Sequence, residues 1–228
     1  MKNFIFIFVL CLTFTLQVSA ANHCSKISYD KSGFDKIYNI IDDAVFDLRY
    51  YSPYNFTGSK IRGYKAPVAY MTKEALQALV KAAEDLREQG YRLLIWDAYR
   101  PKKAVEHFVK WINDINDEGD KSFYPDLNKE DLLGHYLSKN SSHMRGSTID
   151  LTIVNMDGSS VDMGGTFDLF SEISHSNYQK LTKEQKQNRK ILHDAMIKAG
   201  FKGISSEWWH FALKNEPYKN ICFNFDVE

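Results

Sequence analysis

Residues 141–154, which read SSHMRGSTIDLTIV, decide the fold because they pass from a polar loop into an alternating strand. The loop carries His143, and the strand expected over residues 149–154 has Asp150 near its start. Strand geometry puts Asp150 and Thr152 on one face of the strand, and Ile149, Leu151 and Ile153 on the opposite face. An acidic group on an otherwise apolar strand is costly unless a cation meets it. The stretch therefore predicts a central strand with a candidate site for a divalent metal.

Three helices are predicted around this strand. Residues 72–89 place apolar side chains on one stripe, with Thr72 as the N-cap and Gly90 as the stop. A second helix begins at Pro101, and a third begins at Thr182 with a capping box. The inward-facing residues are expected to be Leu76, Leu79, Val80, Ala83 and Leu86, then Val105, Phe108, Val109, Ile112 and Ile115, and last Ile191, Leu192, Ala195, Met196 and Ala199.

Further strands are expected over residues 91–96, near residues 160–163 and within residues 205–213. Residues 116–135 are polar and irregular, which predicts a long loop or short helices. No repeat and no linker divides the chain. Helices segregated from a mainly antiparallel sheet are typical of the α+β class. We therefore expect one α+β domain with a small, mainly antiparallel sheet and helices packed on one side.

The composition is that of an ordinary globular protein, with 44% hydrophobic and 25% charged residues, which excludes disordered and collagen-like chains. Because 29 basic residues balance 29 acidic ones, no overall basic field attracts nucleic acid. Residues 1–20 have the layout of a signal peptide, with Lys2, an apolar core over residues 4–16 and small residues up to Ala20. We expect export to the periplasm or outside the cell, with a mature domain over residues 21–228 that does not insert stably into membranes.

Two cysteines, Cys24 and Cys222, remain after removal of the signal peptide and lie at the two ends of the mature chain. In an exported protein an even pair indicates a disulfide, and two buried free thiols are the alternative. Closing so long a loop would stabilise the fold by about 4–5 kcal/mol in the chain-entropy model.

A third candidate metal ligand is His210, in the segment Glu207-Trp-Trp-His210 near the C-terminus. With His143 and Asp150 it makes a set of two imidazoles and one carboxylate, which leaves a fourth position open for water, as catalytic zinc requires. Other divalent metals also fit such a set. Residues 207 and 210 would face opposite sides of a regular strand, so we expect Glu207 in the turn before it. From there its carboxylate can exchange protons with a water at the metal.

The segments SSHMRGSTIDLTI, IWDAYRP, MGGTFD and EWWH together resemble those of the zinc D-alanyl-D-alanine dipeptidases of the vancomycin-resistance type. The resemblance runs from about Asp47 to about Leu213. The pattern SxHxxGxxxD with a downstream ExxH is typical of the wider superfamily of D,D-peptidases, and MGGTFD with the upstream YYSPYNFTG narrows it to the dipeptidase branch. The resemblance implies a hydrolase that binds one zinc ion per chain and acts on a small D,D-dipeptide such as D-Ala-D-Ala.

The resemblance also implies roles for single residues. Glu207 matches the catalytic acid and base. Arg100 matches the arginine that stabilises the developing oxyanion, which a guanidinium can do through its fixed charge and rigid donors, and Asp97 would orient it. The residues that match the zinc ligands are His143, Asp150 and His210.

Asp168, in MGGTFD, matches the carboxylate that holds the free ammonium of the substrate, and Tyr50 and Ser141 match residues that line the substrate site. A charge clamp on the N-terminus admits dipeptides and excludes longer chains. An exported copy cannot reach the cytoplasmic dipeptide pool that a resistance enzyme destroys. We therefore expect a role in scavenging or in wall turnover.

Two other functions remain open. A D,D-carboxypeptidase or endopeptidase of the same superfamily would act on peptidoglycan stem peptides, although Asp168 argues against it because a polymer has no free ammonium at that position. A non-catalytic zinc or wall-peptide binding module would need neither Glu207 nor Arg100. The sequence leaves the oligomeric state open.

Overall fold

The computed structural model describes residues 24–228, and its centre is a five-stranded sheet. The strands follow the order β3-β5-β6-β8-β7, with β3 parallel to β5 and every other neighbouring pair antiparallel. The expected signal peptide, residues 1–20, lies outside the described residues and stays a prediction. The strand bounds are Val45–Phe46 for β3, Tyr91–Asp97 for β5, Thr148–Asn155 for β6, Phe201–Gly203 for β7 and His210–Leu213 for β8.

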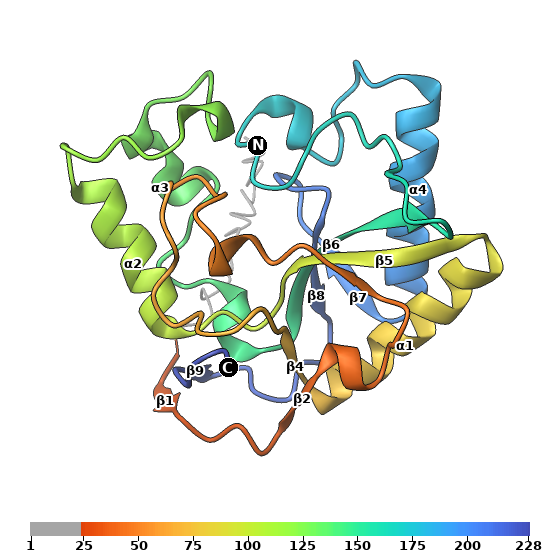
Figure 1. The fold of residues 1–228 in the computed structure, drawn as a ribbon, viewed down its shortest axis with the longest axis horizontal. Coiled ribbons are helices and arrows are strands. Elements are labelled where there is room, and N and C mark those ends of the chain that lie inside the picture. Colours follow the sequence, from red (N-terminus) through yellow and green to blue (C-terminus); the bar gives the residue numbers. More distant parts are fainter. Residues whose placement is uncertain (1–23) are drawn as a thin grey trace, which may run out of the picture.

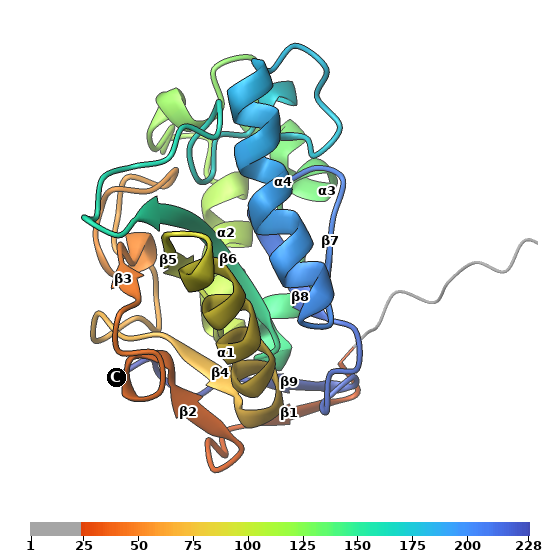
Figure 2. The ribbon, with the colours of Figure 1, turned by 90° about the vertical axis from the view of Figure 1, so that its right-hand side faces the viewer.

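Two long helices cover one face of this sheet (Figures 1 and 2). Helix α1 (Lys73–Glu88) packs against β5, and α4 (Lys183–Lys198) packs against both α1 and β7. Both helices begin as the sequence predicts, because the side chain of Thr72 accepts a first-turn N–H and Thr182 forms a capping box. Their apolar stripes face the sheet, and the prediction of a single α+β domain is confirmed.

Helix α2 (Lys102–Asn113) lies on the other side of the sheet from α1 and α4, near the short helix α3 (Leu132–His135) (Figures 1 and 2). The expectation that the helices pack on one side therefore holds for α1 and α4 but not for α2. The prediction that Ile115 faces inward is wrong, since Ile115 follows the end of α2 and is 89% exposed. The backbone becomes extended at Asp114, which stops the helical period before it reaches Ile115. Trp111 is the last large aromatic side chain of α2, and it is buried.

The pairing of β5, β6 and β8 places polar residues that are distant in the sequence side by side across the sheet. Asp150 of β6 pairs with His210 of β8 on one side and with Asp97 of β5 on the other. A register shift between Ile95 and Asp97 produces this second pairing, and such bulges re-aim a side chain at the end of a strand. The predicted strand at 149–154 therefore lies between the two strands that carry other candidate site residues.

Two small sheets complete the fold. β1 (Lys26–Ser28) runs parallel to β9 (Ile221–Phe223), and the antiparallel pair consists of β2 (Phe34–Lys36) and β4 (Tyr70–Thr72). The sequence does not predict these short strands. The β1–β9 sheet joins the two ends of the described chain and brings the Cα atoms of its two cysteines to 5.4 Å, within disulfide range. The 3-10 helices η1 to η6 are Ile37–Asn39, Arg49–Tyr51, Lys121–Phe123, Lys129–Asp131, Ser142–Arg145 and Glu172–Ser174.

The strand expected near residues 160–163 does not form. After the turn that follows β6, Ser160 makes an isolated bridge to Val154, and the chain then leaves the sheet. The side chain of Asp162 instead accepts a hydrogen bond from the amide of Gln185, which ties this segment to the first turn of α4. Within residues 24–228, none of the helices combines the length and apolar character needed to span a membrane.

Candidate active site

His143, Asp150 and His210 lie together, and all three are buried. His143 comes from η5, Asp150 from β6, and His210 is the first residue of β8. Nε2 of His143 is 3.2 Å from both Oδ2 of Asp150 and Nδ1 of His210, and Nδ1 of His210 is 3.1 Å from Oδ1 of Asp150. Donors at the ~2.0–2.1 Å typical of zinc lie roughly 3.3 Å apart in a tetrahedron. The predicted ligand set therefore has the dimensions of a metal site.

The hydrogen-bond partners of the two imidazoles direct one ring nitrogen of each toward the cluster. The carbonyl oxygen of Ala98, which can only accept, is 2.7 Å from Nδ1 of His143, so that nitrogen carries the hydrogen and Nε2 presents a lone pair. Oγ of Ser142 is 3.4 Å from Nε2 of His210, which leaves Nδ1 facing the cluster. Oδ1 of Asp150 is buried without a hydrogen-bond partner. Ring nitrogens and an unpartnered carboxylate oxygen that converge on one point fit a divalent cation.

The charge state of the cluster also suits metal binding. Burial acts to raise the pKa of Asp150, but the imidazoles of His143 and His210 outweigh it and hold this pKa below its ordinary value. Burial lowers the pKa of His210. Ionised carboxylates and neutral imidazoles are the forms that bind metals.

Arg100 is held at the edge of the cluster by two carboxylates. Its Nε donates to Oδ2 of Asp97 at 2.9 Å, and its Nη2 donates to Oδ2 of Asp150 at 3.3 Å. Asp97 also accepts a hydrogen bond from the hydroxyl of Tyr64 at 2.6 Å. Burial raises the pKa of Asp97, and the charge of Arg100 opposes that rise. Asp97 thus lies where it can orient Arg100. No local pattern in the sequence indicates that Tyr64 is the hydrogen-bond partner of Asp97.

Glu207 lies in the turn directly before β8, as the sequence predicts. Its Oε2 is 3.6 Å from Nδ1 of His210. Burial raises the pKa of Glu207 well above its ordinary value, and the nearby Asp150 and Asp168 raise it further. A carboxyl group whose pKa is raised in this way is suited to giving and taking protons near neutral pH.

Asp168 combines an unusual backbone with a buried carboxyl group. Its φ of 57° lies in the left-handed region, which no other non-glycine among residues 24–228 occupies. The hydroxyl of Tyr50 donates to Oδ2 of Asp168 at 2.8 Å, and Tyr50 lines the same cavity as Asp168. Burial, with the nearby charge of Asp150, raises the pKa of Asp168 to about 8. Within the described chain this carboxyl group forms no ion pair.

A cavity of about 260 Å³ opens beside the metal-ligand cluster. Its polar lining includes the buried Ser141, which directly precedes η5, together with Arg100, Glu207 and Asp168. Sequence reasoning missed its apolar wall, because these residues come from irregular segments with no periodic pattern. That wall consists of Tyr136, Leu137, Phe170 and Ile204.

Comparisons with known proteins identify relatives of this chain. A family model described as D-ala-D-ala dipeptidase matches residues 30–228. A D-alanyl-D-alanine dipeptidase of Enterococcus faecium is 39% identical over 199 residues, which are 86% of this chain and 98% of that protein. The D-alanyl-D-alanine dipeptidase of Streptomyces coelicolor is 34% identical and aligns over 82% of this chain and 96% of its own length.

Among solved structures, a vancomycin-resistance D,D-pentapeptidase in complex with Zn(II) matches with a TM-score of 0.38 and 11% identity, over 70% of this chain and 80% of that one. The family assignment does not depend on this distant likeness. It depends on the family model, which spans nearly all of the described residues, and on the two dipeptidases, which align over almost their whole lengths. The chain therefore belongs to the D-alanyl-D-alanine dipeptidase family of peptidases.

Proposed function

We propose that this protein is a zinc dipeptidase that hydrolyses free D-Ala-D-Ala and related D,D-dipeptides. Three features support the proposal: the family of the chain, the cluster that fits a metal, and a small cavity with an uncompensated acid in its wall. The cavity volume of about 260 Å³ is below the ~300–1,000 Å³ of pockets for drug-sized ligands, which favours a dipeptide over a longer stem peptide.

The metal would be held by Nε2 of His143, Nδ1 of His210 and the carboxylate of Asp150. A zinc ion in such a site acts as a Lewis acid on a carbonyl oxygen and makes a water molecule more acidic. The carbonyl of Ala98 and the hydroxyl of Ser142 hold the two rings in the orientation that this requires.

Glu207 and Arg100 supply the remaining chemistry. Glu207 takes a proton from the attacking water and later gives it to the leaving amine, for which its raised pKa is suited. Arg100 stays charged at all working pH values and offers donors to the oxygen on which negative charge develops. Its ion pair with Asp97 keeps the guanidinium in place, so no reorganisation is needed when that charge appears.

Asp168 is the single observation that carries the choice of a dipeptide. An ionised carboxylate buried without an ion-pair partner is unstable, and although the charge of Arg100 acts against the rise, the pKa of about 8 in the metal-free protein reflects this. The free ammonium of a dipeptide would supply the missing charge and bring that pKa down. A stem peptide has an amide at this position, which carries no charge, so the carboxyl group would remain uncompensated.

The test compares D-Ala-D-Ala with N-acetyl-D-Ala-D-Ala and with a stem pentapeptide, measuring release of D-Ala by the zinc-loaded protein. We expect cleavage of the free dipeptide and at least a hundredfold lower kcat/KM for both substrates without the ammonium. Equal rates on all three would favour a carboxypeptidase. Zinc-loaded protein with no activity on any of them would favour a binding module.

We also propose that the protein is exported and that Cys24 and Cys222 are bonded. Residues 1–20 have the pattern of a signal peptide, and the 5.4 Å between the two Cα atoms suits a disulfide. Cell fractionation with N-terminal sequencing tests export, and we expect mature protein outside the cytoplasm beginning at Ala21. Alkylation with and without reductant tests the bond, and we expect labelling of both cysteines only after reduction. Cytosolic protein with its N-terminus intact would contradict the proposal of export. Free thiols in the exported protein would contradict the proposed bond between the two cysteines.

A further inference from the structure

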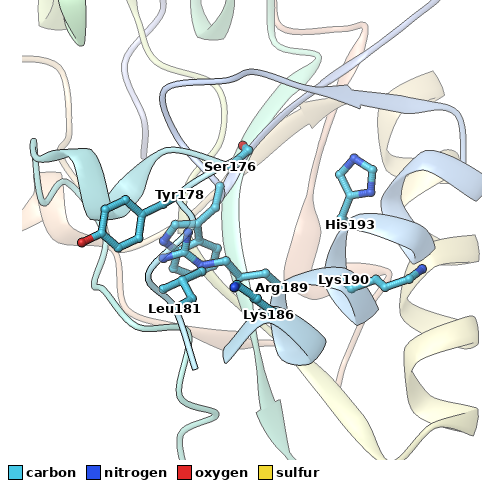
Figure 3. A pocket seen from close by; sticks show the side chains of 8 residues that line it. Ser176, Tyr178, Leu181, Lys186, Arg189, Lys190 and His193 are labelled. Atoms are coloured by element: carbon cyan, nitrogen blue, oxygen red, sulfur yellow. The ribbon is translucent and has the colours of Figure 1, made fainter. Parts of the chain in front are cut away.

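A second cavity, of about 270 Å³, lies between α4 and the loop that precedes it, and we call it the α4 pocket. Figure 3 shows its basic side chains, Lys186, Arg189, Lys190 and His193, all of which come from α4. Within the described chain, no residue lines both the α4 pocket and the cavity beside the metal-ligand cluster. The pocket is therefore a separate feature that the proposed hydrolysis does not use.

Arg189 is the buried cation of the α4 pocket. Its guanidinium donates to the carbonyl oxygens of Met163, Ile173 and His175, which occupy three of its five N–H groups. Trp208 covers the guanidinium, with its ring centre 5.2 Å from Cζ. Burial lowers the pKa of Arg189 to about 10, and the charge of Asp162, which forms no ion pair with it, only partly opposes this fall. Carbonyl groups fix the position of this cation, and no carboxylate of the described chain forms an ion pair with it.

The other basic residues leave further positive charge at the pocket. Lys186 donates to the carbonyl oxygen of Gln179 at 2.7 Å and has no carboxylate partner in the described chain. Lys190 pairs with Asp194, a carboxylate that also lies 3.5 Å from Nδ1 of His193. None of the residues that line the pocket is acidic. An anion would therefore meet two cations without ion-pair partners, Lys186 and Arg189.

The rest of the lining is apolar and aromatic. Leu181, Tyr178 and the buried Trp208 face the same space (Figure 3 labels the first two). The indole Nε1 of Trp208 is buried and has no hydrogen-bond partner, which is costly for an N–H group. Carboxylate oxygens accept hydrogen bonds and carry the charge that the cations lack.

We propose that the α4 pocket binds a small ligand that carries a carboxylate on an aromatic or branched apolar group. The carboxylate would pair with Lys186 and Arg189, and the apolar part would cover Leu181 and the ring of Trp208. A free phosphate ion would leave the apolar wall uncovered. A simple amino acid would bring its ammonium close to Lys186 and Arg189, which repel it.

The experiment follows the indole N–H signals of ¹⁵N-labelled, zinc-loaded protein during titration with benzoate, benzamide or inorganic phosphate. The variant Trp208→Phe assigns the signal of Trp208. We expect benzoate to shift this signal saturably, and benzamide and phosphate to bind at least tenfold more weakly. No shift with benzoate, or equal binding of either comparison compound, would overturn the proposal.

Two charge reversals on α4 distinguish benzoate binding in this pocket from benzoate binding at the metal site. If benzoate binds at the metal, neither reversal should change its Kd. Lys186→Glu should weaken benzoate binding by about fivefold or more, as expected when one partly exposed ion pair becomes repulsive. Lys183→Glu, at an exposed position on the same helix that does not line the pocket, serves as the matched control and should change the Kd less than twofold. Calorimetric titration of both variants gives these values without any substitution of Trp208. Equal effects of the two reversals would contradict the assigned site.

Discussion

Replacing Asp168 with asparagine should stabilise the metal-free protein at neutral pH. Burial and the charge of Asp150 raise the pKa of Asp168 from 3.8 to about 8. One pKa unit corresponds to about 1.4 kcal/mol, so ionising this group reduces the free energy of unfolding by up to about 6 kcal/mol. Below about pH 3.8 the carboxyl group is neutral in both the folded and the unfolded chain, so it causes no loss of stability there. The loss grows as the pH rises through the interval between the unfolded and folded pKa values, and it is constant above the folded one.

Urea unfolding of the metal-free chain measures this effect, because a bound metal would offset the charge of Asp150. We expect Asp168→Asn to exceed the wild type by about 2 kcal/mol at pH 5, about 3 kcal/mol at pH 6 and roughly 5 kcal/mol at pH 8. Asparagine still accepts the Tyr50 hydroxyl and tolerates the left-handed backbone.

The matched control is Asp157→Asn, at an exposed turn where hydrogen bonds from Ser159 lower the pKa of the carboxyl group. That variant should gain no stability at any of these pH values. A difference between Asp168→Asn and the wild type that did not vary with pH would refute the reasoning. The same substitution should raise KM for D-Ala-D-Ala, since a neutral amide cannot pair with an ammonium.

Three further changes test other parts of the molecule. Glu207→Gln should keep the metal and lower kcat by about 10²–10⁴-fold, the usual contribution of general acid–base catalysis; loss of metal by elemental analysis would contradict this role. Arg100→Lys removes the fork that joins Asp97 to Asp150 and should lower kcat by about 10²–10³-fold, whereas a higher KM alone would assign Arg100 to substrate binding. Cys222→Ser should lower the free energy of unfolding by up to about 5 kcal/mol, because the bond would close a separation of 198 residues; urea midpoints that match those of the wild type would show that the bond adds nothing.

The elements that could be predicted are those with local signals. Helices α1 and α4 have side-chain caps and apolar stripes, and β6 has an alternating pattern bounded by turn residues. The motif of His143, Asp150 and His210 also indicates a shared site, and the pairing of β6 with β8 accounts for the meeting of Asp150 with His210. These features depend on residues that are neighbours in the chain or on one strand pairing.

The other parts depend on contacts that no local pattern records. A one-residue register shift in β5 sets Asp97 opposite Asp150, and Tyr64 reaches Asp97 from a distant loop. Short strands such as β1 and β9 form only because the two ends of the described chain meet. The wrong prediction that Ile115 faces inward has the same origin. The apolar period of the sequence continues to Ile115, although the backbone leaves the helix at Asp114.

Asp168 concentrates two unfavourable features in one residue. Its left-handed φ is one that glycine or asparagine adopts more easily, and its buried carboxylate has no cationic partner in the described chain. Neither the left-handed backbone nor the buried carboxylate stabilises the protein without its ligand, and asparagine at this position would reduce the destabilisation from both. An ammonium ligand, however, gains from a carboxylate that has been stripped of water and forms no ion pair in the described chain. The residue that opposes stability is therefore the one that can distinguish a free N-terminus from a peptide bond, and a more stable neutral residue at position 168 would lose that distinction.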